Sequence, residues 1–148
     1  MKIVAEVNGQ TPKNWPPRFI SDVVKKTIAR ARYSCLQKKD INLSIAFVSA
    51  SQIKKLNRIY RRKNQVTDVL SFANYRDLAK LKKERERSVF LGDILIYLEY
   101  AKKSAKIINI PLEKEIAFVI SHGVLHLLGF RHGKEMFELQ DVISGYKK

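Results

Sequence analysis

The chain has 148 residues, of which 45% are hydrophobic, and this is enough for one domain with a core of its own. It carries 29 lysines and arginines against 14 acidic residues, and the net charge of +15 favours a polyanionic partner, most often nucleic acid, unless it only reflects a lysine-rich genome. No run of about 18 apolar residues is present, which excludes a membrane span, and the single cysteine, Cys35, excludes an internal disulfide and indicates a reducing cytoplasm.

The first part of the chain predicts two strands separated by a helix, followed by a basic helix. In chain order, the pattern indicates a strand at 2–7, a turn at Asn8-Gly9, a proline-rich loop at 10–17, a helix at 18–37 and a strand at 41–48. Ser49 or Ser51 can cap the basic helix. We expect its inward face to carry the apolar residues Ile53, Leu56 and Ile59 or Tyr60.

The second part of the chain predicts two strands and three helices. They are a strand at 67–72, a charged loop at 74–87, a strand at 89–96, and helices at 97–108, 112–128 and 134–144. The strand at 89–96 is apolar nearly throughout, so we expect it to be buried on both faces. Pro111 stands where a first helical residue would be. This order predicts an α+β fold, with a single small mixed sheet packed with helices, in one domain over 1–148.

All three histidines of the chain fall between Ser121 and His132. His122 and His126 are four residues apart, so on a helix they share one face. Gly129 can take the left-handed conformation that ends a helix, after which the chain can turn back and bring His132 toward the other two. The alternative is a pair of ordinary helix histidines and a surface histidine, but the spacing favours a metal site.

Three imidazoles without a nearby cysteine are the ligand set of a catalytic zinc site with an open fourth position. One Zn²⁺ held in this way would acidify a bound water and could supply hydroxide as a nucleophile. The spacing also matches the metzincin metalloproteases, in which a glutamate after the first histidine is the general base. Here that residue is Gly123, which can hold no proton, so peptide hydrolysis by this route is disfavoured.

The stretch His122-Gly-Val-Leu-His-Leu-Leu-Gly-Phe-Arg-His132 resembles the signature of the bacterial YbeY family, zinc-dependent endoribonucleases and rRNA maturation factors. The usual form of that signature is His-Gly-x-Leu-His-Leu-x-Gly-Tyr-Asp-His. Residues 56–72 resemble the family's Asn-x-x-Tyr-Arg and Thr-Asp-Val-Leu-Ser-Phe-Pro elements, and Gly92-Asp-Ile-Leu-Ile96 resembles its Gly-Asp-Ile strand. The three motifs occur in the family's order and extend the resemblance over about residues 40–145.

The resemblance implies that His122, His126 and His132 are zinc ligands and that Arg61 is the family's functional arginine, the four forming the catalytic set. It also implies a metal cleft at the end of a helix, lined by basic residues. The implied activity is a single-strand-specific endoribonuclease for 3′-end maturation of 16S rRNA and ribosome quality control. The implied partners are rRNA and the small ribosomal subunit in the bacterial cytoplasm, with no membrane and no DNA.

Physical chemistry gives Arg61 a matching role, because a guanidinium can clamp phosphoryl oxygens bidentately. The alternative for Arg61 is an exposed arginine at the end of a basic helix. Asp68 and Asp93 are candidates for orienting a histidine or accepting a proton, or for plain hydrogen bonds at strand ends. Arg131 departs from the family pattern, since it replaces an aspartate just before the third histidine.

Two rival functions remain on the sequence alone. In the first, the protein is a non-catalytic assembly factor in which zinc only pins the helix end and the basic face binds rRNA. In the second, it is a metalloprotease, which Gly123 disfavours. For the nuclease, the nucleophile is either a zinc-bound water or a 2′-hydroxyl polarised by zinc.

Overall fold

The structure, a computed structural model, describes residues 2–9, 11 and 18–145. Within them lies a four-stranded sheet made of β1 (Lys2–Gly9), β2 (Asp40–Phe47), β3 (Val69–Ala73) and β4 (Ser88–Ile96). The strand order is β1-β2-β4-β3, with β1, β2 and β4 parallel and the edge strand β3 antiparallel to β4. The predicted α+β fold with a mixed sheet is confirmed. The loop predicted at 10–17 lies, except for Thr11, outside the described residues.

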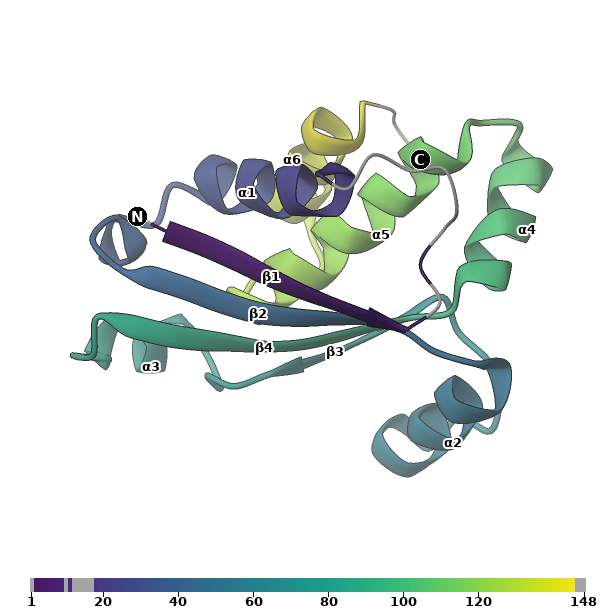
Figure 1. The fold of residues 1–148 in the computed structure, drawn as a ribbon, viewed down its shortest axis with the longest axis horizontal. Coiled ribbons are helices and arrows are strands. Elements are labelled where there is room, and N and C mark those ends of the chain that lie inside the picture. Colours follow the sequence, from purple (N-terminus) through teal and green to yellow (C-terminus); the bar gives the residue numbers. More distant parts are fainter. Residues whose placement is uncertain (1, 10, 12–17, 146–148) are drawn as a thin grey trace.

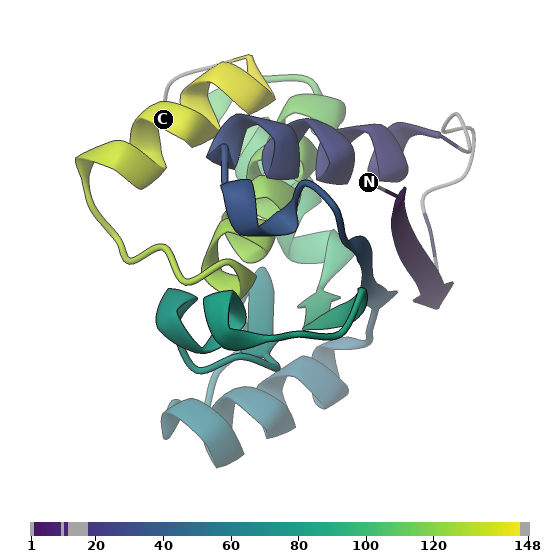
Figure 2. The same cartoon turned by 90° about the vertical axis from the view of Figure 1, so that its left-hand side faces the viewer.

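Three of the helices form a layer on one side of the sheet, and α2 (Ala50–Arg61) stands on the other side. The other helices are α1 (Phe19–Ala31), α3 (Leu78–Lys83), α4 (Leu98–Ile108), α5 (Leu112–Leu127) and α6 (Lys134–Ser144), with a short 3-10 helix at Ser34–Leu36. Figure 1 shows α1, α5 and α6 above the sheet and α2 below it, and Figure 2 shows the same separation from the side. No helix in the described part of the chain is long and apolar enough to cross a membrane.

The core lies between the sheet and this helix layer. On β2 the residues that alternate toward the helices, among them Ile41, Leu43 and Ile45, are buried, whereas their neighbours on the other face are only partly covered. Helix α5 is central to the layer, since it packs against α1, α4, α6, β3 and β4. Because α5 packs on one face of the sheet, this packing determines which side chains of α5 face the sheet and which point away from it.

Strand β4 is not buried on both faces as predicted, because Phe90 is 41% exposed. Its burial alternates but changes phase in mid-strand. The buried apolar residues are Val89 and Leu91 before the change and Ile94 and Ile96 after it. The register of β2 with β4 shifts by one residue between these pairs, at Leu91-Gly92. This extra residue in β4 hides the alternation in the sequence.

Three predicted boundaries differ from the structure. The first helix ends at Ala31, because Arg32 takes the left-handed conformation (φ 55°) and its N–H bonds the carbonyl of Ala29. Asn8-Gly9 is not a turn, since both residues continue β1 in parallel pairing with β2. Pro111 is the cap of α5 rather than its first residue. Such ends depend on backbone hydrogen bonds that propensity alone does not determine.

Helix α2 begins as predicted but does not face inward as predicted. The Ser49 side chain accepts from the N–H of Gln52, and the Gln52 side chain accepts from the N–H of Ser49, which is a capping box. Ile53 is buried, but Ile59 and Tyr60 are 53% and 64% exposed. The C-terminal half of α2 therefore presents apolar as well as basic side chains to solvent.

The charged loop predicted at 74–87 contains the short helix α3. Asp77 caps it by accepting from the N–H of Lys80 at 2.9 Å, and Leu81 is buried in the core. One apolar anchor among many charges is too weak a periodic signal to predict a helix of this length.

Candidate metal centre

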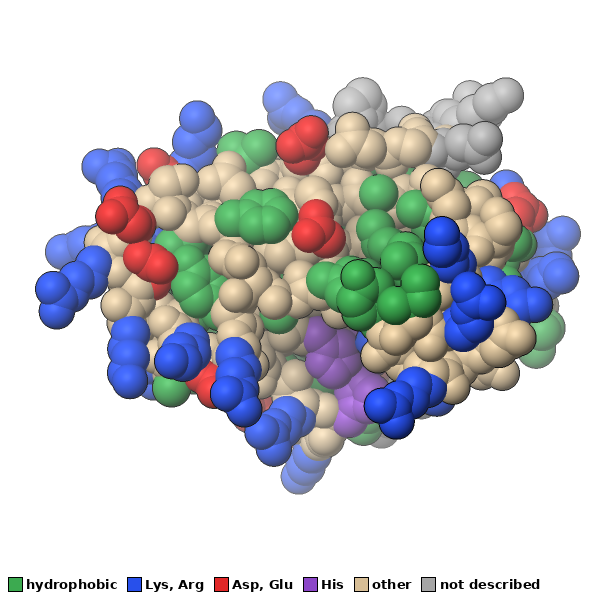
Figure 3. Space-filling model, turned by 90° about the horizontal axis from the view of Figure 1, so that it is seen from below, with side chains coloured by type: hydrophobic (Ala, Val, Ile, Leu, Met, Phe, Trp, Pro, Cys, Tyr) green, Lys and Arg blue, Asp and Glu red, His purple; other side chains and the backbone are tan. Residues whose placement is uncertain are grey.

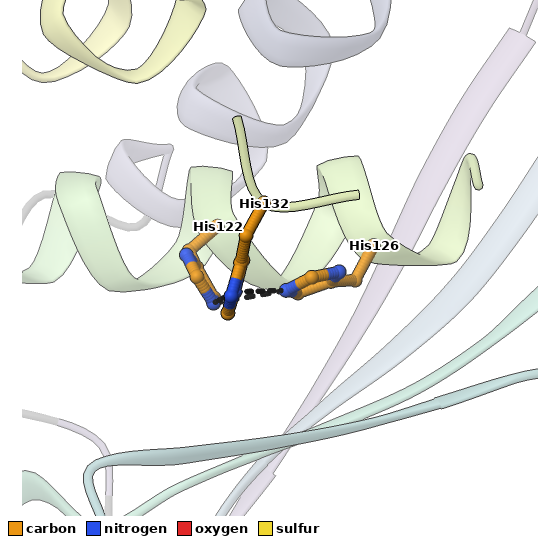
Figure 4. Close-up of side chains that lie close together, drawn as sticks. All are labelled: His122, His126 and His132. Carbon is orange, nitrogen blue, oxygen red and sulfur yellow. Dashed lines mark hydrogen bonds between the residues drawn. The ribbon is translucent and has the colours of Figure 1, made fainter. Parts of the chain in front are cut away.

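The three histidines converge at the C-terminal end of α5. His122 and His126 project from one side of this helix, and His132 reaches them from the chain that returns toward α6 (Figure 4). The Nε2 atom of His126 lies 3.0 Å from that of His122 and 2.9 Å from that of His132, and the third Nε2–Nε2 distance is 3.3 Å. The predicted meeting of the three imidazoles is confirmed, whereas their role as ligands stays a prediction.

The turn that brings His132 back is set by Gly129. Its φ of 90° is a left-handed conformation that costs a glycine little. The N–H of Gly129 bonds the carbonyl of His126 at 3.0 Å, and the N–H of Phe130 bonds the carbonyl of Leu125 at 2.9 Å. These two bonds form the motif that commonly ends helices at a glycine. The predicted helix end at Gly129 is thus confirmed.

The cluster has the geometry and the chemistry of a metal site. Nitrogens bonded at about 2.05 Å in tetrahedral arrangement lie about 3.3 Å apart, close to the three observed distances. The Nδ1 atom of His126 lies 3.1 Å from the carbonyl oxygen of Phe130, which can only accept. The proton of His126 is therefore on Nδ1, and the lone pair of its Nε2 points into the cluster. The carbonyl end of α5 adds a field that favours a cation.

Burial keeps His122 and His126 in the neutral form that binds metals. Burial first, and then the neighbouring His126 and His132, lower the pKa of His122 to about 4. The pKa of His126 is also lowered, first by burial and then by His132. The charge of Arg61 contributes a smaller part of both shifts, so its guanidinium acts on the cluster although it belongs to another element.

Gly123 faces the sheet rather than the histidines. A Cβ atom at this position would lie 2.9 Å from the Cγ2 of Ile94 and 3.1 Å from the Oγ of Ser71. The glycine therefore allows α5 to approach β3 and β4 closely. A glutamate here would be forced into the sheet, so the metzincin general base has no place in this helix.

Arg61 is the last residue of α2 and is exposed. The end of α2 is held near β3, since the rings of Tyr60 and Phe72 meet edge to face at 5.0 Å. Figure 3 shows the histidines between two groups of lysine and arginine side chains, of which the right-hand group lies over the position of α2 in Figure 1. Basic side chains over α2 and the histidines thus lie on one face of the molecule (Figure 3).

The remaining candidates from the sequence are Asp93, Asp68 and Arg131, and each has contacts of its own. The carboxylate of Asp93 accepts a hydrogen bond from Ser44, on the sheet face away from the helix layer. The backbone carbonyl of Asp68 accepts from the N–H of Tyr97 at 2.9 Å. Arg131 is exposed and lines a shallow groove together with Tyr33, Phe130 and Lys134.

Gln140 is a neighbour of the cluster that the sequence interpretation missed. It comes from α6, is 0% exposed, and its side-chain nitrogen lies 3.2 Å from Nδ1 of His122. A signal for it was present, because Gln140 is the polar residue between Met136 and Ile143 on the buried stripe of α6. A fully buried polar side chain needs a partner, and here that partner is a histidine of the site.

Comparison with known proteins matches this chain to a protein family. The family described as Endoribonuclease YbeY matches residues 7–145. A Persephonella marina protein named Endoribonuclease YbeY is 37% identical over 85% of this chain and 80% of its own length. Its namesake from Caldicellulosiruptor bescii is 40% identical over 80% and 77%.

The fold is shared with a solved structure as well. The solution structure of TM1509 from Thermotoga maritima matches 95% of this chain and 87% of its own, with a TM-score of 0.59 and 25% identity. This likeness and the family match agree with the resemblance predicted from the three sequence motifs. The chain therefore belongs to the endoribonuclease YbeY family and is a nuclease.

Proposed function

We propose that the protein is a single-strand-specific endoribonuclease that uses one zinc ion, held by His122, His126 and His132, to mature the 3′ end of 16S rRNA. The convergence of the three Nε2 atoms, with the charge of Arg61 acting on the same point, is the observation that carries the proposal. Ribosome quality control and a cytoplasmic location, with the small ribosomal subunit as partner, belong to the same proposal.

Zinc is the metal that the donor set favours. The three donors are neutral imidazoles, and no thiolate or carboxylate completes the cluster within the described residues. Three protein ligands leave a position open, which is typical of catalytic rather than structural zinc. When bound, zinc would lower the pKa of a water molecule and offset charge on a phosphoryl oxygen.

The chain's own residues supply the rest of the proposed chemistry. His122 and His126, whose pKa values are lowered, hold their place as neutral side chains near pH 7. Arg61 can bind two phosphoryl oxygens at once as negative charge builds on them. The exposed basic side chains of α2 would hold the RNA backbone, and the exposed ring of Tyr60 beside them could stack an unpaired base.

The test is a comparison of the wild-type protein with His126→Ala. We expect about one zinc per wild-type chain and cleavage of a single-stranded precursor segment, and we expect His126→Ala to lose both while it keeps its fold and RNA affinity. Undiminished cleavage by His126→Ala would overturn the metal mechanism. A substrate with 2′-deoxy sugars then separates the nucleophiles, since undiminished cutting removes the 2′-hydroxyl route.

The same experiment addresses the non-catalytic assembly factor. Membership in a nuclease family disfavours it, and intact RNA binding with lost cleavage in His126→Ala would exclude an assembly-only role. A protein that binds rRNA and zinc but cuts no precursor, in free or ribosome-bound form, would instead support it.

A further inference from the structure

Gln140 makes an unbalanced set of hydrogen bonds. Its side-chain nitrogen lies 3.2 Å from Nδ1 of His122 and 3.5 Å from the carbonyl oxygen of Phe118. Its side-chain oxygen is buried and, among the described residues, has no hydrogen-bond partner. Leaving a buried acceptor unpaired costs about 1–3 kcal/mol. An apolar residue would fill this place between α5 and α6 without that cost, so packing alone does not account for a glutamine.

The direction of the Gln140 amide decides which nitrogen of His122 carries the proton. A neutral imidazole has one N–H. When the amide nitrogen of Gln140 donates to Nδ1, the His122 proton must be on Nε2, the nitrogen inside the cluster. When the amide is turned by 180°, its oxygen accepts from Nδ1–H, and Nε2 presents a lone pair instead. The two ends of a carboxamide have nearly the same shape, so this turn needs no repacking. It gives up the long 3.5 Å contact of the amide nitrogen with the Phe118 carbonyl, which still accepts from Ser121 at 2.9 Å.

We infer that Gln140 is a positioning residue that, with its carbonyl end toward Nδ1, holds His122 in the tautomer able to bind a metal. This inference rests on the metal site of the proposed function. His126 already shows the arrangement in a fixed form, because its Nδ1 faces the main-chain carbonyl of Phe130. The side chain of Gln140 would orient His122 as the Phe130 carbonyl orients His126. Groups that orient a metal ligand in this way commonly change metal affinity by about 10- to 100-fold.

The experiment compares Gln140→Met, which keeps the volume and removes the acceptor, with Gln140→Glu, which accepts from Nδ1–H in either orientation. Ile143→Val, on the same buried stripe of α6, is the matched control. The readouts are zinc affinity by competition with a chromophoric chelator and thermal unfolding in EDTA. We expect Gln140→Met to bind zinc about 10- to 100-fold more weakly, Gln140→Glu to bind at least as tightly as wild type, and Ile143→Val to be unchanged.

Nitrogen-15 spectra of the zinc-loaded wild-type protein give a direct check, since we expect the His122 proton on Nδ1. A proton on Nε2 of His122, wild-type affinity in Gln140→Met, or equal weakness in both Gln140 variants would overturn the inference while leaving the proposed function intact. A wild-type protein that binds no zinc would overturn the proposed function and this inference with it. Weak binding by an unfolded Gln140→Met is recognised by its unfolding curve in EDTA, and the comparison then rests on Gln140→Glu and the spectra.

Discussion

The histidine side of the site lies on a buried helix, whereas the arginine side lies on an exposed one. In α5 ten of sixteen residues are buried, and the helix packs against both the sheet and three other helices. In α2 only Ile53 and Asn57 are buried among twelve residues. The end of α2 is fixed by a few contacts, such as the Asn57 side chain, which donates to the carbonyl of Gln65 at 2.9 Å.

This difference matches what each side has to do. Metal ligands must meet within a few tenths of an ångström, and dense packing with oriented ring nitrogens provides that. A guanidinium on a long side chain can reach a charged phosphate from several positions, and its field acts over a distance. The site therefore combines a densely packed histidine half with an arginine half that is defined mainly by charge.

The largest effect is expected from removing His132, the most exposed of the three proposed ligands. His132→Ala should weaken zinc binding by more than about 100-fold, beyond the range typical of groups that only orient a ligand. Because His132 is exposed, the free energy of unfolding of the EDTA-treated protein should change by less than about 0.5 kcal/mol. Chelator competition and chemical denaturation measure the two quantities. Wild-type zinc affinity would show that the third histidine is not a ligand.

A smaller effect is expected on the arginine side, and on activity alone. Arg61→Ala should lower cleavage by about 100- to 1000-fold, as does loss of one group that stabilises developing charge. Zinc affinity should stay equal or rise slightly, because the charge of Arg61 opposes a cation at the histidines. Lys55→Ala, which removes the same charge earlier on α2, is the control and should change cleavage much less. Equal losses in both variants would contradict a specific role for Arg61.

Acid should destabilise the histidine side of the EDTA-treated protein. The pKa of His122 is about 4 in the folded state and 6.5 ordinarily, so the unfolded state takes up a proton first as the pH falls. The stability due to neutral His122 is complete above about pH 6.5 and is lost progressively toward pH 4. Since carboxylates titrate nearby, the measurement is the difference between wild type and His122→Asn. Parallel stability curves for the two proteins would contradict the burial of a neutral His122.

The smallest effect tests how loosely α2 is held. Ser49→Ala removes the cap of α2 and should cost about 1 kcal/mol in unfolding free energy. Ser51→Ala, in the first turn of the same helix, is the control and should cost less than half of this. Zinc affinity should be unchanged in both, since α2 is not among the elements that pack closely against α5. A loss of zinc in Ser49→Ala would mean that the two sides of the site are more strongly coupled than their packing indicates.

The same contrast explains what the sequence could predict. His122, His126 and Gly129 lie within eight residues on one helix and its end, so local periodicity was enough to place them. Arg61 lies on a helix far from α5 in the sequence, and without the family motif its pattern was that of any exposed basic helix. Gln140 could not be found in this way because its partner is on another helix, and a single polar residue between Met136 and Ile143 is a weak signal.

The connection from α5 to α6 has a consequence for how this protein can vary. Loops between helices usually accept insertions, but here a few residues end α5 at Gly129, place the Phe130 carbonyl against His126 and deliver His132. One added residue would move His132 by up to about 3.5 Å, more than the length of a bond to zinc. The number of residues between Gly129 and His132 therefore has to stay constant if the three histidines bind zinc together. A glycine inserted after Phe130 should abolish zinc binding, measured by the same chelator competition. Retained zinc affinity would show that the segment between Gly129 and His132 can rearrange to accommodate an extra residue.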